Sequence, residues 1–396
     1  MTMRISRVIL SVCLCINSLS PSLPADCSQQ RTVTSFGKLD TTIRRLDPTH
    51  PQSFIPESDA RYLRARLVVD TPSNCAWSLT IRDQYLHPVQ TLAASDFQAT
   101  SVSWTSRVYG PKLTIELHTC AGNAGPSLTV NRVIWMPSTV RLGPNAFYSL
   151  KSFDGPDWKE LYEESSIRTT DPQRVETGDA VGILVLSTEN GAWSCSGFMV
   201  TDTLFLTNWH CGANEDQAPP QEDYWNKEIV HDAIIDLSWD TNGISREFLV
   251  SSVEQADINL DFAILRVRPV GTPSPVNIGI LADWLPAPGD TLYTIHHPLG
   301  MRKTYSGSCN ARTVPFPNWK QPPRSTDFTH DCDTEAGSSG APLFNTTGEI
   351  VGVHHLPYDF DGACRVTSEN KGISTHEILA VLKPELKTGL TIHEKQ

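Results

Sequence analysis

The sequence predicts an all-β protein, in which a small β-sandwich precedes a double antiparallel β-barrel that ends in a C-terminal helix. Short runs of alternating or β-branched residues recur along the chain, and Pro, Gly, Asn or Asp residues bound each run. No stretch alternates strands with long helices, which argues against a parallel α/β sheet. The length of 396 residues suggests two or three domains.

Residues 1–25 are expected to be a secretory signal peptide. Arg4 and Arg7 precede an apolar run over 8–16, and residues suited to cleavage follow at 23–25. A membrane-spanning helix needs about 20 apolar residues, more than this run contains. We therefore expect a secreted protein, extracellular or periplasmic, without a membrane anchor.

Residues 27–138 are expected to form the sandwich, as an accessory domain or a pro-domain. Its candidate strands are 65–69, 77–81, 101–104 and 112–117. Residues 139–175 combine Gly and Pro with a charged stretch, so we expect a linker with one helical turn there.

Residues 176–390 form the second block, which is long enough for two packed antiparallel barrels. Its candidate strands are 181–186, 197–200, 204–207, 262–267, 291–295 and 349–353. The best helix candidate is 373–386, where Ser374 can cap the first turn and Glu377 completes a capping box.

The chain is acidic, with 32 Lys and Arg against 44 Asp and Glu and a formal net charge of −12. Phosphate groups are bound by clustered Lys and Arg, so we expect neither a nucleic-acid nor an anionic-membrane partner. No Cys-x-x-Cys pair occurs, and the helical zinc pattern begun by His376 and Glu377 lacks its second His, because Ala380 stands there. We therefore expect no metal and no cofactor.

Three motifs in the second block each place a reactive side chain beside a candidate strand. His210 follows the 204–207 strand, Asp261 precedes the 262–267 strand, and Ser339 lies in a Gly-Ser-Ser-Gly turn. Acyl transfer needs a hydroxyl nucleophile, a base that takes its proton, and a carboxylate that orients the base. We expect these three roles to fall to Ser339, His210 and Asp261. Asp257 competes with Asp261, which we favour because it directly precedes the apolar run.

The amide groups of Gly337 and Ser339 are the expected oxyanion hole. A Gly can adopt the backbone shape that points its N–H at the spot reached by the amide of the nucleophile. A His base further predicts that activity on peptides rises as the pH passes through about 6–7.

These motifs resemble those of the chymotrypsin-like (trypsin-like) serine proteases, in the bacterial branch of lysyl and glutamyl endopeptidases. The matching stretches are 205–212, 261–262, 295–298 and 337–340. The resemblance implies a double β-barrel with the active site between the barrels, and the same roles for His210, Asp261 and Ser339.

Two positions depart from that family. Trp209 replaces the small residue that animal trypsins usually have before the active His, which affects packing and not chemistry. Ser338 replaces the Asp that pairs with a new N-terminal amine when the animal enzymes are activated. We therefore expect activity that does not depend on that ion pair.

The ten cysteines fit an oxidising compartment. Signal removal would take Cys13 and Cys15 and leave an even number. The resemblance implies a Cys195–Cys211 disulfide that staples the loop of the active His. The sequence leaves the other pairs open; we expect Cys75–Cys120, Cys309–Cys332 and, by elimination, Cys27–Cys364.

The pocket for the residue before the scissile bond stays open between two alternatives. Candidate pocket residues are Asp333, Thr334, His354, His355 and Glu369. Thr334 with His354 resembles glutamyl endopeptidases and would bind a carboxylate. His355 with Glu369 resembles lysyl endopeptidases, and Asp333 stands where trypsins have their pocket Asp. A buried carboxylate selects Lys or Arg, so we favour a basic residue.

The sequence therefore predicts a secreted serine endopeptidase that hydrolyses polypeptide substrates through an acyl-enzyme. The alternative is an inactive protease relative that acts as a secreted binding or adhesion protein. The intact His, Asp and Ser set favours the enzyme.

Overall fold

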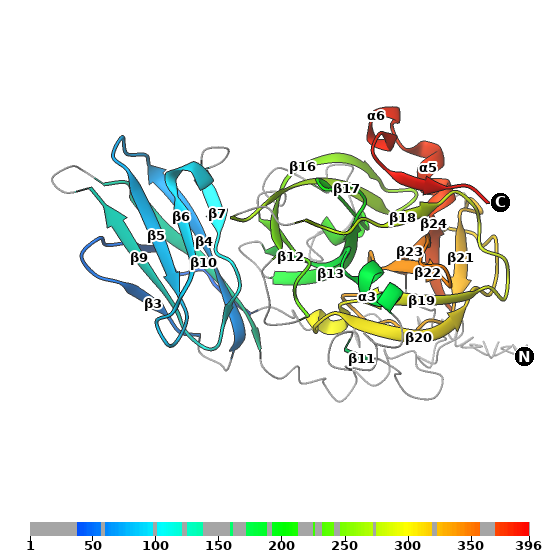
Figure 1. Cartoon of the computed structure of the whole chain (residues 1–396), viewed down its shortest axis with the longest axis horizontal. Helices are drawn as coiled ribbons and strands as arrows, with labels where there is room; N and C mark the ends of the chain where they lie inside the picture. Colours follow the sequence, from blue (N-terminus) through cyan, green and yellow to red (C-terminus); the bar gives the residue numbers. More distant parts are fainter. Residues whose placement is uncertain are drawn as a thin grey trace, which may run out of the picture.

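Figure 1 shows the computed structural model as three β-rich units in a row, with the chain running from the sandwich through a barrel to a second large sheet. The structure describes residues 38–56, 60–97, 101–120, 125–137, 159–160, 172–187, 192–212, 225, 232–240, 246–271, 275–318, 323–356 and 369–395. The expected signal peptide, the Cys27–Cys364 pair and most of the expected linker lie outside these residues.

The first unit consists of two antiparallel sheets. The six-stranded sheet contains β1 (Lys38–Asp40), β2 (Arg44–Arg45), β4 (Ala60–Thr71), β7 (Val102–Trp104), β8 (Val108–Tyr109) and β10 (Ser127–Pro137). The four-stranded sheet has the order β3 (Gln52–Phe54), β9 (Leu113–Thr119), β5 (Trp77–Arg82) and β6 (Pro88–Ala93). Alternate residues of the facing strands, such as Leu67, Leu79 and Ile115, form one buried core, as expected for a sandwich.

The middle unit is a closed barrel. Its strands follow the order β12 (Val181–Ser187), β13 (Ala192–Met199), β14 (Leu204–Thr207), β17 (Phe262–Pro269), β16 (Glu247–Asp257) and β15 (Ala233–Asp236). The short helix α3 (Pro172–Gly178) leads into it. The all-β barrel fold predicted from the short strands is therefore confirmed.

The third unit is a nine-stranded sheet. Its main order is β11 (Lys159–Glu160), β20 (Thr304–Asn310), β19 (Thr291–His296), β22 (Pro342–Asn345), β23 (Ile350–Leu356), β18 (Ile280–Ala282) and β25 (Thr391–His393). Strands β21 (Asp327–His330) and β24 (Asn370–Ser374) pair with each other, and β24 also pairs with β23. The order brings β22, which follows the Ser339 turn, and its partner β23 into the middle of the sheet.

The C-terminal helix is divided in two. The expected helix over 373–386 is observed as α5 (Thr375–Val381) and α6 (Pro384–Lys387), because a Pro within a helix removes a backbone donor and clashes with the preceding turn. The expected cap is present, since Ser374 accepts a hydrogen bond from the amide of His376. Within the described residues, no helix has the length and apolarity needed to cross a membrane.

Among the described residues, the cysteines form three disulfides, Cys75–Cys120, Cys195–Cys211 and Cys309–Cys332, as expected. The first lies in the sandwich, the second in the closed barrel and the third in the nine-stranded sheet.

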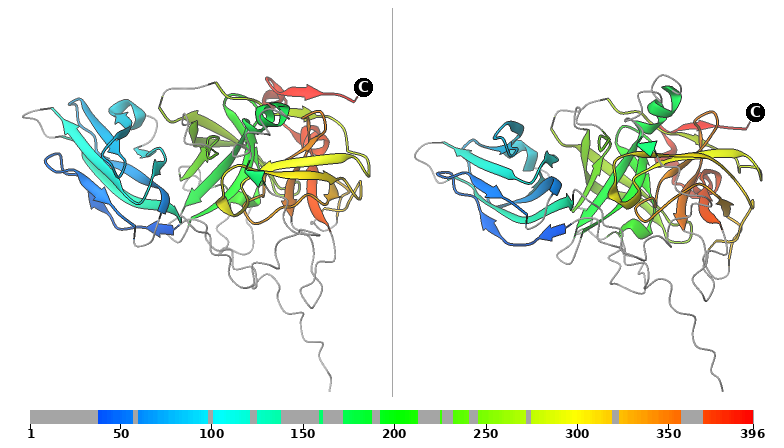
Figure 2. Two further views of the ribbon diagram at one scale, coloured as in Figure 1. Left: turned by 60° about the horizontal axis from the view of Figure 1, so that its bottom comes forward. Right: turned by 90° about the horizontal axis from the view of Figure 1, so that it is seen from below.

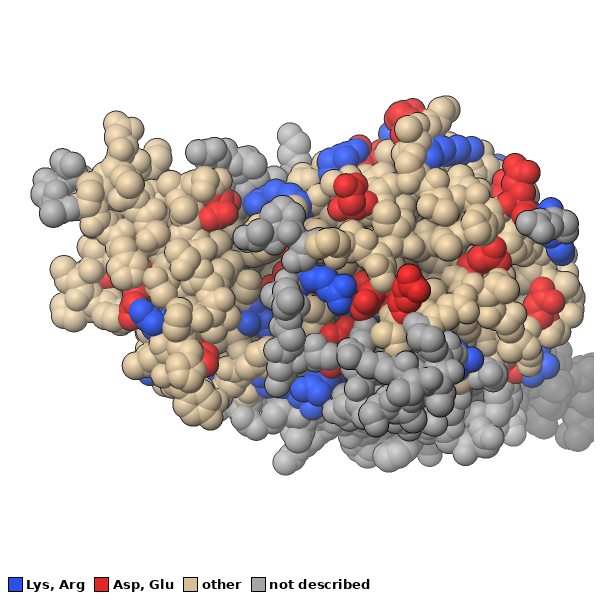
Figure 3. Space-filling model, viewed as in Figure 1, with Lys and Arg blue, Asp and Glu red and all other residues tan. Residues whose placement is uncertain are grey.

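The two junctions between the units differ in chemistry. Figure 2 shows the sandwich and the barrel side by side from two further directions, and buried ion pairs join them. On the face in Figure 3, basic and acidic side chains lie interspersed near this junction. Barrel and nine-stranded sheet instead share an apolar cluster that includes Phe198, Phe262, Tyr293 and Ile373.

Candidate active site

Two neighbouring strands of the closed barrel bring His210 and Asp261 together. Strand β14 pairs antiparallel with β17, and Thr207 lies opposite Ala263. The chain therefore leaves β14 beside the place where it enters β17. His210 comes just after the first of these ends and Asp261 just before the second, so 51 residues of separation in the sequence become direct contact.

The carboxylate of Asp261 holds His210 at two points. The imidazole Nδ1 lies 2.7 Å from Asp261 Oδ2, and the backbone N–H of His210 donates to Oδ1 at 2.9 Å. Asp261 is 1% exposed, and its backbone is anchored because Asn208 Nδ2 donates to its carbonyl oxygen at 2.9 Å. With Nδ1–H donated to the carboxylate, the other ring nitrogen of His210 carries a lone pair and can accept a proton.

The competing carboxylate takes a different role. Asp257 Oδ1 accepts hydrogen bonds from the amides of Asn259 and Leu260 at 2.7 and 3.0 Å, so it stabilises the turn before β17. The preference for Asp261 over Asp257 as the partner of His210 agrees with this geometry.

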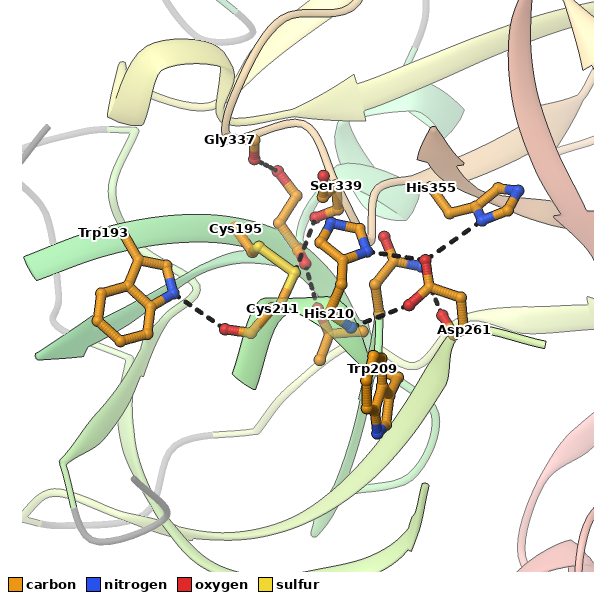
Figure 4. The surroundings of a disulfide bond; sticks show 12 residues. Trp193, Cys195, Trp209, His210, Cys211, Asp261, Gly337, Ser339 and His355 are labelled. Atoms are coloured by element: carbon orange, nitrogen blue, oxygen red, sulfur yellow. Dashed lines mark hydrogen bonds and ion pairs between the residues drawn. A yellow bond between two sulfur atoms is a disulfide. The ribbon is translucent and has the colours of Figure 1, made fainter. Parts of the chain in front are cut away.

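The Ser339 turn reaches the same place from the nine-stranded sheet. The carbonyl oxygen of Ser339 accepts a hydrogen bond from the amide of Ser196 at 2.8 Å and lies 3.9 Å from Cys211 Sγ. Figure 4 shows the ring of His210 between Ser339 and Asp261, beside the Cys195–Cys211 disulfide. Among the described residues, no hydrogen bond joins His210 to Ser339, and such contacts are often long until a substrate binds.

The turn before Ser339 contains a glycine in the left-handed conformation. Gly337 has φ +93°, a conformation that favours glycine, and an added Cβ would lie 2.8 Å from the carbonyl oxygen of His297. Ser196 Oγ donates to the carbonyl oxygen of Gly337 at 2.8 Å and so fixes the peptide on its far side. In the described part of the chain, the amides of Gly337 and Ser339 have no protein acceptor.

Ser338 is held from inside the protein. Its Oγ lies 2.7 Å from His296 Nδ1 and accepts a hydrogen bond from the amide of Glu335 at 3.0 Å. Burial lowers the pKa of His296 well below its usual value, so this imidazole is neutral. The turn therefore uses a hydroxyl–imidazole contact where the resembling animal enzymes use an ion pair.

His355 contacts the back of the candidate catalytic pair. Its Nδ1 lies 3.2 Å from Asp261 Oδ2 and its Nε2 lies 3.0 Å from Asp327 Oδ2. Burial alone would lower the pKa of His355, but the two carboxylates outweigh it and raise the pKa to about 9. An imidazolium between two carboxylates leaves one net negative charge beside His210.

The same contacts settle the charge of Asp261. Burial alone would raise the pKa of Asp261, yet His210 and His355 outweigh it and hold it well below the usual value. Sequence reasoning placed His355 in the substrate pocket and did not identify Asp327. The signal that could have found this pair is strand alternation, because His354 and His355 must point to opposite faces of β23.

The other pocket candidates lie on the neighbouring strands. His354 Nδ1 lies 3.2 Å from His330 Nε2, and burial together with the charged His355 lowers the pKa of His354 to about 3. Thr329 Oγ1 donates to the carboxylate of Glu369 at 2.5 Å. These four side chains belong to β21 and β23 and to the residue just before β24.

Asp333 and Thr334 lie on the segment between β21 and the Ser339 turn. Ser306 accepts a hydrogen bond from the amide of Asp333 at 3.2 Å, and Thr334 is 3% exposed. Glu369 and Asp333 are each partly exposed, whereas His354 and Thr334 are buried.

One group of potential metal ligands lies near this site. Ligand atoms of Cys195, His210 and Cys211 lie within 4.8 Å of one another. The two sulfur atoms are joined in a disulfide, so they offer no thiolate, and thiolate is the form of Cys that binds metal. This set of side chains does not fit a metal ion.

Part of the chain is similar to known peptidases. Residues 195–353 match the family described as the trypsin-like peptidase domain. Similar solved structures include an inactive form of Rv3671c from M. tuberculosis H37Rv, with 18% identity and a TM-score of 0.39 over 58% of this chain and 94% of that chain. The active form of Rv3671c protease has 19% identity and a TM-score of 0.40 over 58% of this chain and 89% of that chain.

A serine endoprotease from Yersinia pestis has 19% identity and a TM-score of 0.40, over 55% of this chain and 67% of that chain. No curated protein sequence matches this chain.

The family match covers both halves of the candidate site. It begins within β13 of the closed barrel and ends within β23 of the nine-stranded sheet, so it includes His210, Asp261 and Ser339. Residues 195–353 are therefore similar to the trypsin-like peptidase domain, and the described residues have the all-β barrel fold of such proteases.

Proposed function

We propose that this protein is a secreted serine endopeptidase in which Ser339 is the nucleophile, His210 the general base and Asp261 the group that orients His210. The observation that carries the proposal is the doubly bound His210–Asp261 pair beside a turn whose amides, at Gly337 and Ser339, have no acceptor in the described residues.

The reaction uses these atoms in two balanced steps. Ser339 Oγ attacks the carbonyl carbon of the scissile peptide while its proton passes to the free ring nitrogen of His210. The carbonyl oxygen becomes an oxyanion that accepts hydrogen bonds from the two amides. His210 then gives the proton to the leaving nitrogen, which departs as an amine and leaves an ester on Ser339. Water, deprotonated by His210, hydrolyses that ester and restores the hydroxyl.

The charges around Asp261 favour the first step. The imidazolium formed on His210 faces a set in which Asp261 and Asp327 carry two negative charges and His355 one positive charge. The set therefore has one net negative charge, which the His210 imidazolium balances when Ser339 loses its proton. In a buried setting such compensation lowers the barrier more than it would in water.

Labelling with a fluorophosphonate probe tests this proposal. The wild-type chain should be labelled and should cleave peptides, and Ser339→Ala should abolish both. Ser251→Ala is the matched control, because Ser251 is exposed on β16 and its hydroxyl donates only to the carbonyl oxygen of Arg266 among the described residues. Absence of labelling in the wild-type chain would favour the alternative of a binding or adhesion protein.

For specificity we propose a basic residue before the scissile bond. Glu369 and Asp333 are partly exposed carboxylates, the first just before β24 and the second on the segment that leads to the Ser339 turn. His354 is held uncharged by its lowered pKa, so it offers little attraction to an acidic side chain.

Digestion of a proteome-derived peptide mixture, with cleavage sites identified by mass spectrometry, tests this choice. We expect cleavage after Lys or Arg, and a roughly 10- to 100-fold lower kcat/KM for such peptides in Glu369→Gln or Asp333→Asn, as expected for loss of a charged hydrogen bond. The ester hydrolysis of a neutral substrate should change little. Cleavage after Glu or Asp would instead assign the pocket to His354 and Thr334.

A further inference from the structure

A set of buried charges fixes the sandwich to the closed barrel. Arg64 and Arg107 of the sandwich are 1% and 4% exposed. Arg64 Nη2 donates to Asp236 Oδ2 at 2.6 Å and its Nη1 binds Glu247. Arg107 also binds Asp236, and its Nη2 donates to the carbonyl oxygen of Ser238 at 3.0 Å. Two guanidinium groups thus face two carboxylates, in a geometry that defines how the sandwich sits on the barrel.

Trp239 connects this charged set with residues near the candidate active site. Its ring is 1% exposed, meets the ring of Tyr62 edge-on at a centroid distance of 4.8 Å, and lies 5.3 Å from Arg107 Cζ. On the other side, Trp239 Nε1 donates to the carbonyl oxygen of Gly300 at 3.0 Å. The carbonyl oxygen of Trp239 accepts a hydrogen bond from the amide of Lys303 at 2.8 Å. Trp239 therefore contacts the sandwich on one side and the turn over 298–300 on the other.

The 298–300 turn lies directly beside the turn over 335–340, which carries the amides of Gly337 and Ser339 and is called the oxyanion turn here. The amide of Leu299 donates to the carbonyl oxygen of Ala336 at 2.6 Å. A Cβ added to Gly337 would lie 3.2 Å from the amide nitrogen of Leu299 and 3.4 Å from that of Gly300. Leu299 has φ +56°, which is unfavourable for a Leu, so its surroundings must hold it in this shape.

One apolar cluster spans all of these parts. It unites buried residues of the sandwich, the barrel and the turn, with Met301 and Ala336 packed against it. Its members include Tyr62, Trp104, Ile134, Met136, Ile183, Val185, Trp239, Leu249 and Leu299. Packed interiors transmit displacements because they contain few voids, so movement of the sandwich side would be felt at the turn.

We propose that the N-terminal sandwich holds the oxyanion turn in its working shape, through Trp239 and the 298–300 turn, so that it is a permanent part of the enzyme and not a removable pro-domain. Trp239 is the positioning residue of this connection. The inference rests on the proposed function, since it concerns the same turn. It also accounts for how the turn is held when Ser338 occupies the place of an ion-paired Asp.

Trp239→Phe tests the connection with a small change. The ring stays in the cluster, but the N–H that binds Gly300 is lost. We expect kcat to fall about 10- to 100-fold, because an oxyanion donor displaced by a fraction of its bond length loses much of its effect. Affinity for a peptide aldehyde, whose adduct places an oxygen in the oxyanion hole, should fall by the same factor.

Binding of an uncleaved peptide should remain unchanged. It is measured in Ser339→Ala and in Ser339→Ala/Trp239→Phe, where the ground-state complex persists. Trp104→Phe is the matched control, because Trp104 lies in the same cluster and its Nε1 has no partner among the described residues. This control should keep the wild-type kcat.

Tyr62→Leu extends the test to the sandwich itself. It should lower kcat in the same way, and adding Trp239→Phe to it should bring little further loss, since both changes interrupt one connection. Equal effects of Trp104→Phe and Trp239→Phe, or additive losses in the double variant, would overturn the inference.

Hydrogen exchange separates this inference from the proposed function. Amide exchange over 335–340 should be faster in Trp239→Phe and Tyr62→Leu than in Trp104→Phe, whether or not the protein cleaves peptides. If the wild type is unreactive toward the fluorophosphonate, the proposed function fails while the exchange data still decide the connection. Unchanged exchange over 335–340 in both variants would overturn the inference alone.

Discussion

The two junctions of this molecule both contain an apolar cluster, but they differ in how many buried ion pairs they contain. Between sandwich and barrel, four arginines and three carboxylates form buried ion pairs. Between barrel and nine-stranded sheet, where the candidate active site lies, a cluster rich in Phe, Leu and Ile joins the units. Apolar contact is non-directional, whereas an ion pair requires a particular orientation of both groups. The first junction thus adds directional ion pairs to the apolar cluster around Trp239, whereas the second combines its apolar cluster with the Asp261–His355 pair.

This contrast also predicts how each junction responds to pH. Burial would raise the pKa of Asp236, but Arg107 and Arg64 outweigh it and lower that pKa to about 2. The charged junction should therefore weaken in acid, whereas the aliphatic and Phe side chains in the cluster of the second junction do not titrate.

Asp236→Asn should give the largest effect on stability. It leaves Arg64 and Arg107 buried with one counter-charge fewer, and breaking such a set lowers the free energy of unfolding by about 3–5 kcal/mol. Urea unfolding at neutral pH measures the loss. Because the folded pKa of about 2 is below the ordinary Asp value of 3.8, the stabilisation is present above pH 3.8 and is lost as the pH falls through 2. A difference from wild type that persists at pH 2 would contradict this assignment.

His355 should give the next largest effect, with the opposite pH dependence. Its folded pKa of about 9 is above the ordinary His value of 6.5. Its charge therefore stabilises the fold fully below pH 6.5, and that contribution, about 3 kcal/mol, is lost as the pH rises through 9. His355→Gln should remove this dependence, so its unfolding curves should approach those of wild type at high pH. Parallel pH profiles for the two proteins would show that His355 is uncharged.

Ile295→Val examines the apolar junction. Ile295 is fully buried in the cluster shared by barrel and nine-stranded sheet. Loss of one methylene should lower the free energy of unfolding by about 0.5–1.5 kcal/mol. The loss should be equal at pH 5 and pH 9, measured by the same urea titrations. A pH-dependent loss would mean that the packing around Ile295 depends on a titrating group.

Glu254→Gln should give the smallest effect and serves as the control for Asp236→Asn. Glu254 binds Arg266 at 2.9 Å on the barrel surface, where the Arg266 side chain is 44% exposed. Exposed pairs contribute about 0–1 kcal/mol, because water screens them and ordering two side chains costs entropy. A loss as large as that of Asp236→Asn would remove the distinction between buried and surface pairs.

Much of the candidate site could be predicted from sequence because its signals are local. His210, Asp261 and Ser339 each stand beside a strand or Gly-rich turn that a single window of sequence reveals. Most predicted strands, such as 181–186 and 262–267, are observed with ends shifted by a few residues. Strands β10 and β16 were not predicted, and both have register shifts that interrupt regular alternation.

The contacts of the buried arginines could not be predicted. Arg64 and Arg66 interrupt the apolar pattern of β4, and a charged residue on a strand usually indicates a solvated face. Their partners are distant in sequence, with 172 residues between Arg64 and Asp236. The bridging position of His355 was missed for a similar reason, because Asp327 belongs to a strand that no local pattern connects to β23.

The edges of the nine-stranded sheet have a consequence for behaviour at high concentration. Its outer strands in the described residues are short: β11 and β25 contain two and three residues, and β21, which among these strands pairs with β24 alone, contains four. A sheet edge offers unpaired backbone groups that can recruit a strand from another molecule, and a very short edge offers few of them. A sheet of this size should therefore resist edge-to-edge aggregation, so concentrated solutions of the folded protein should stay free of fibrillar material.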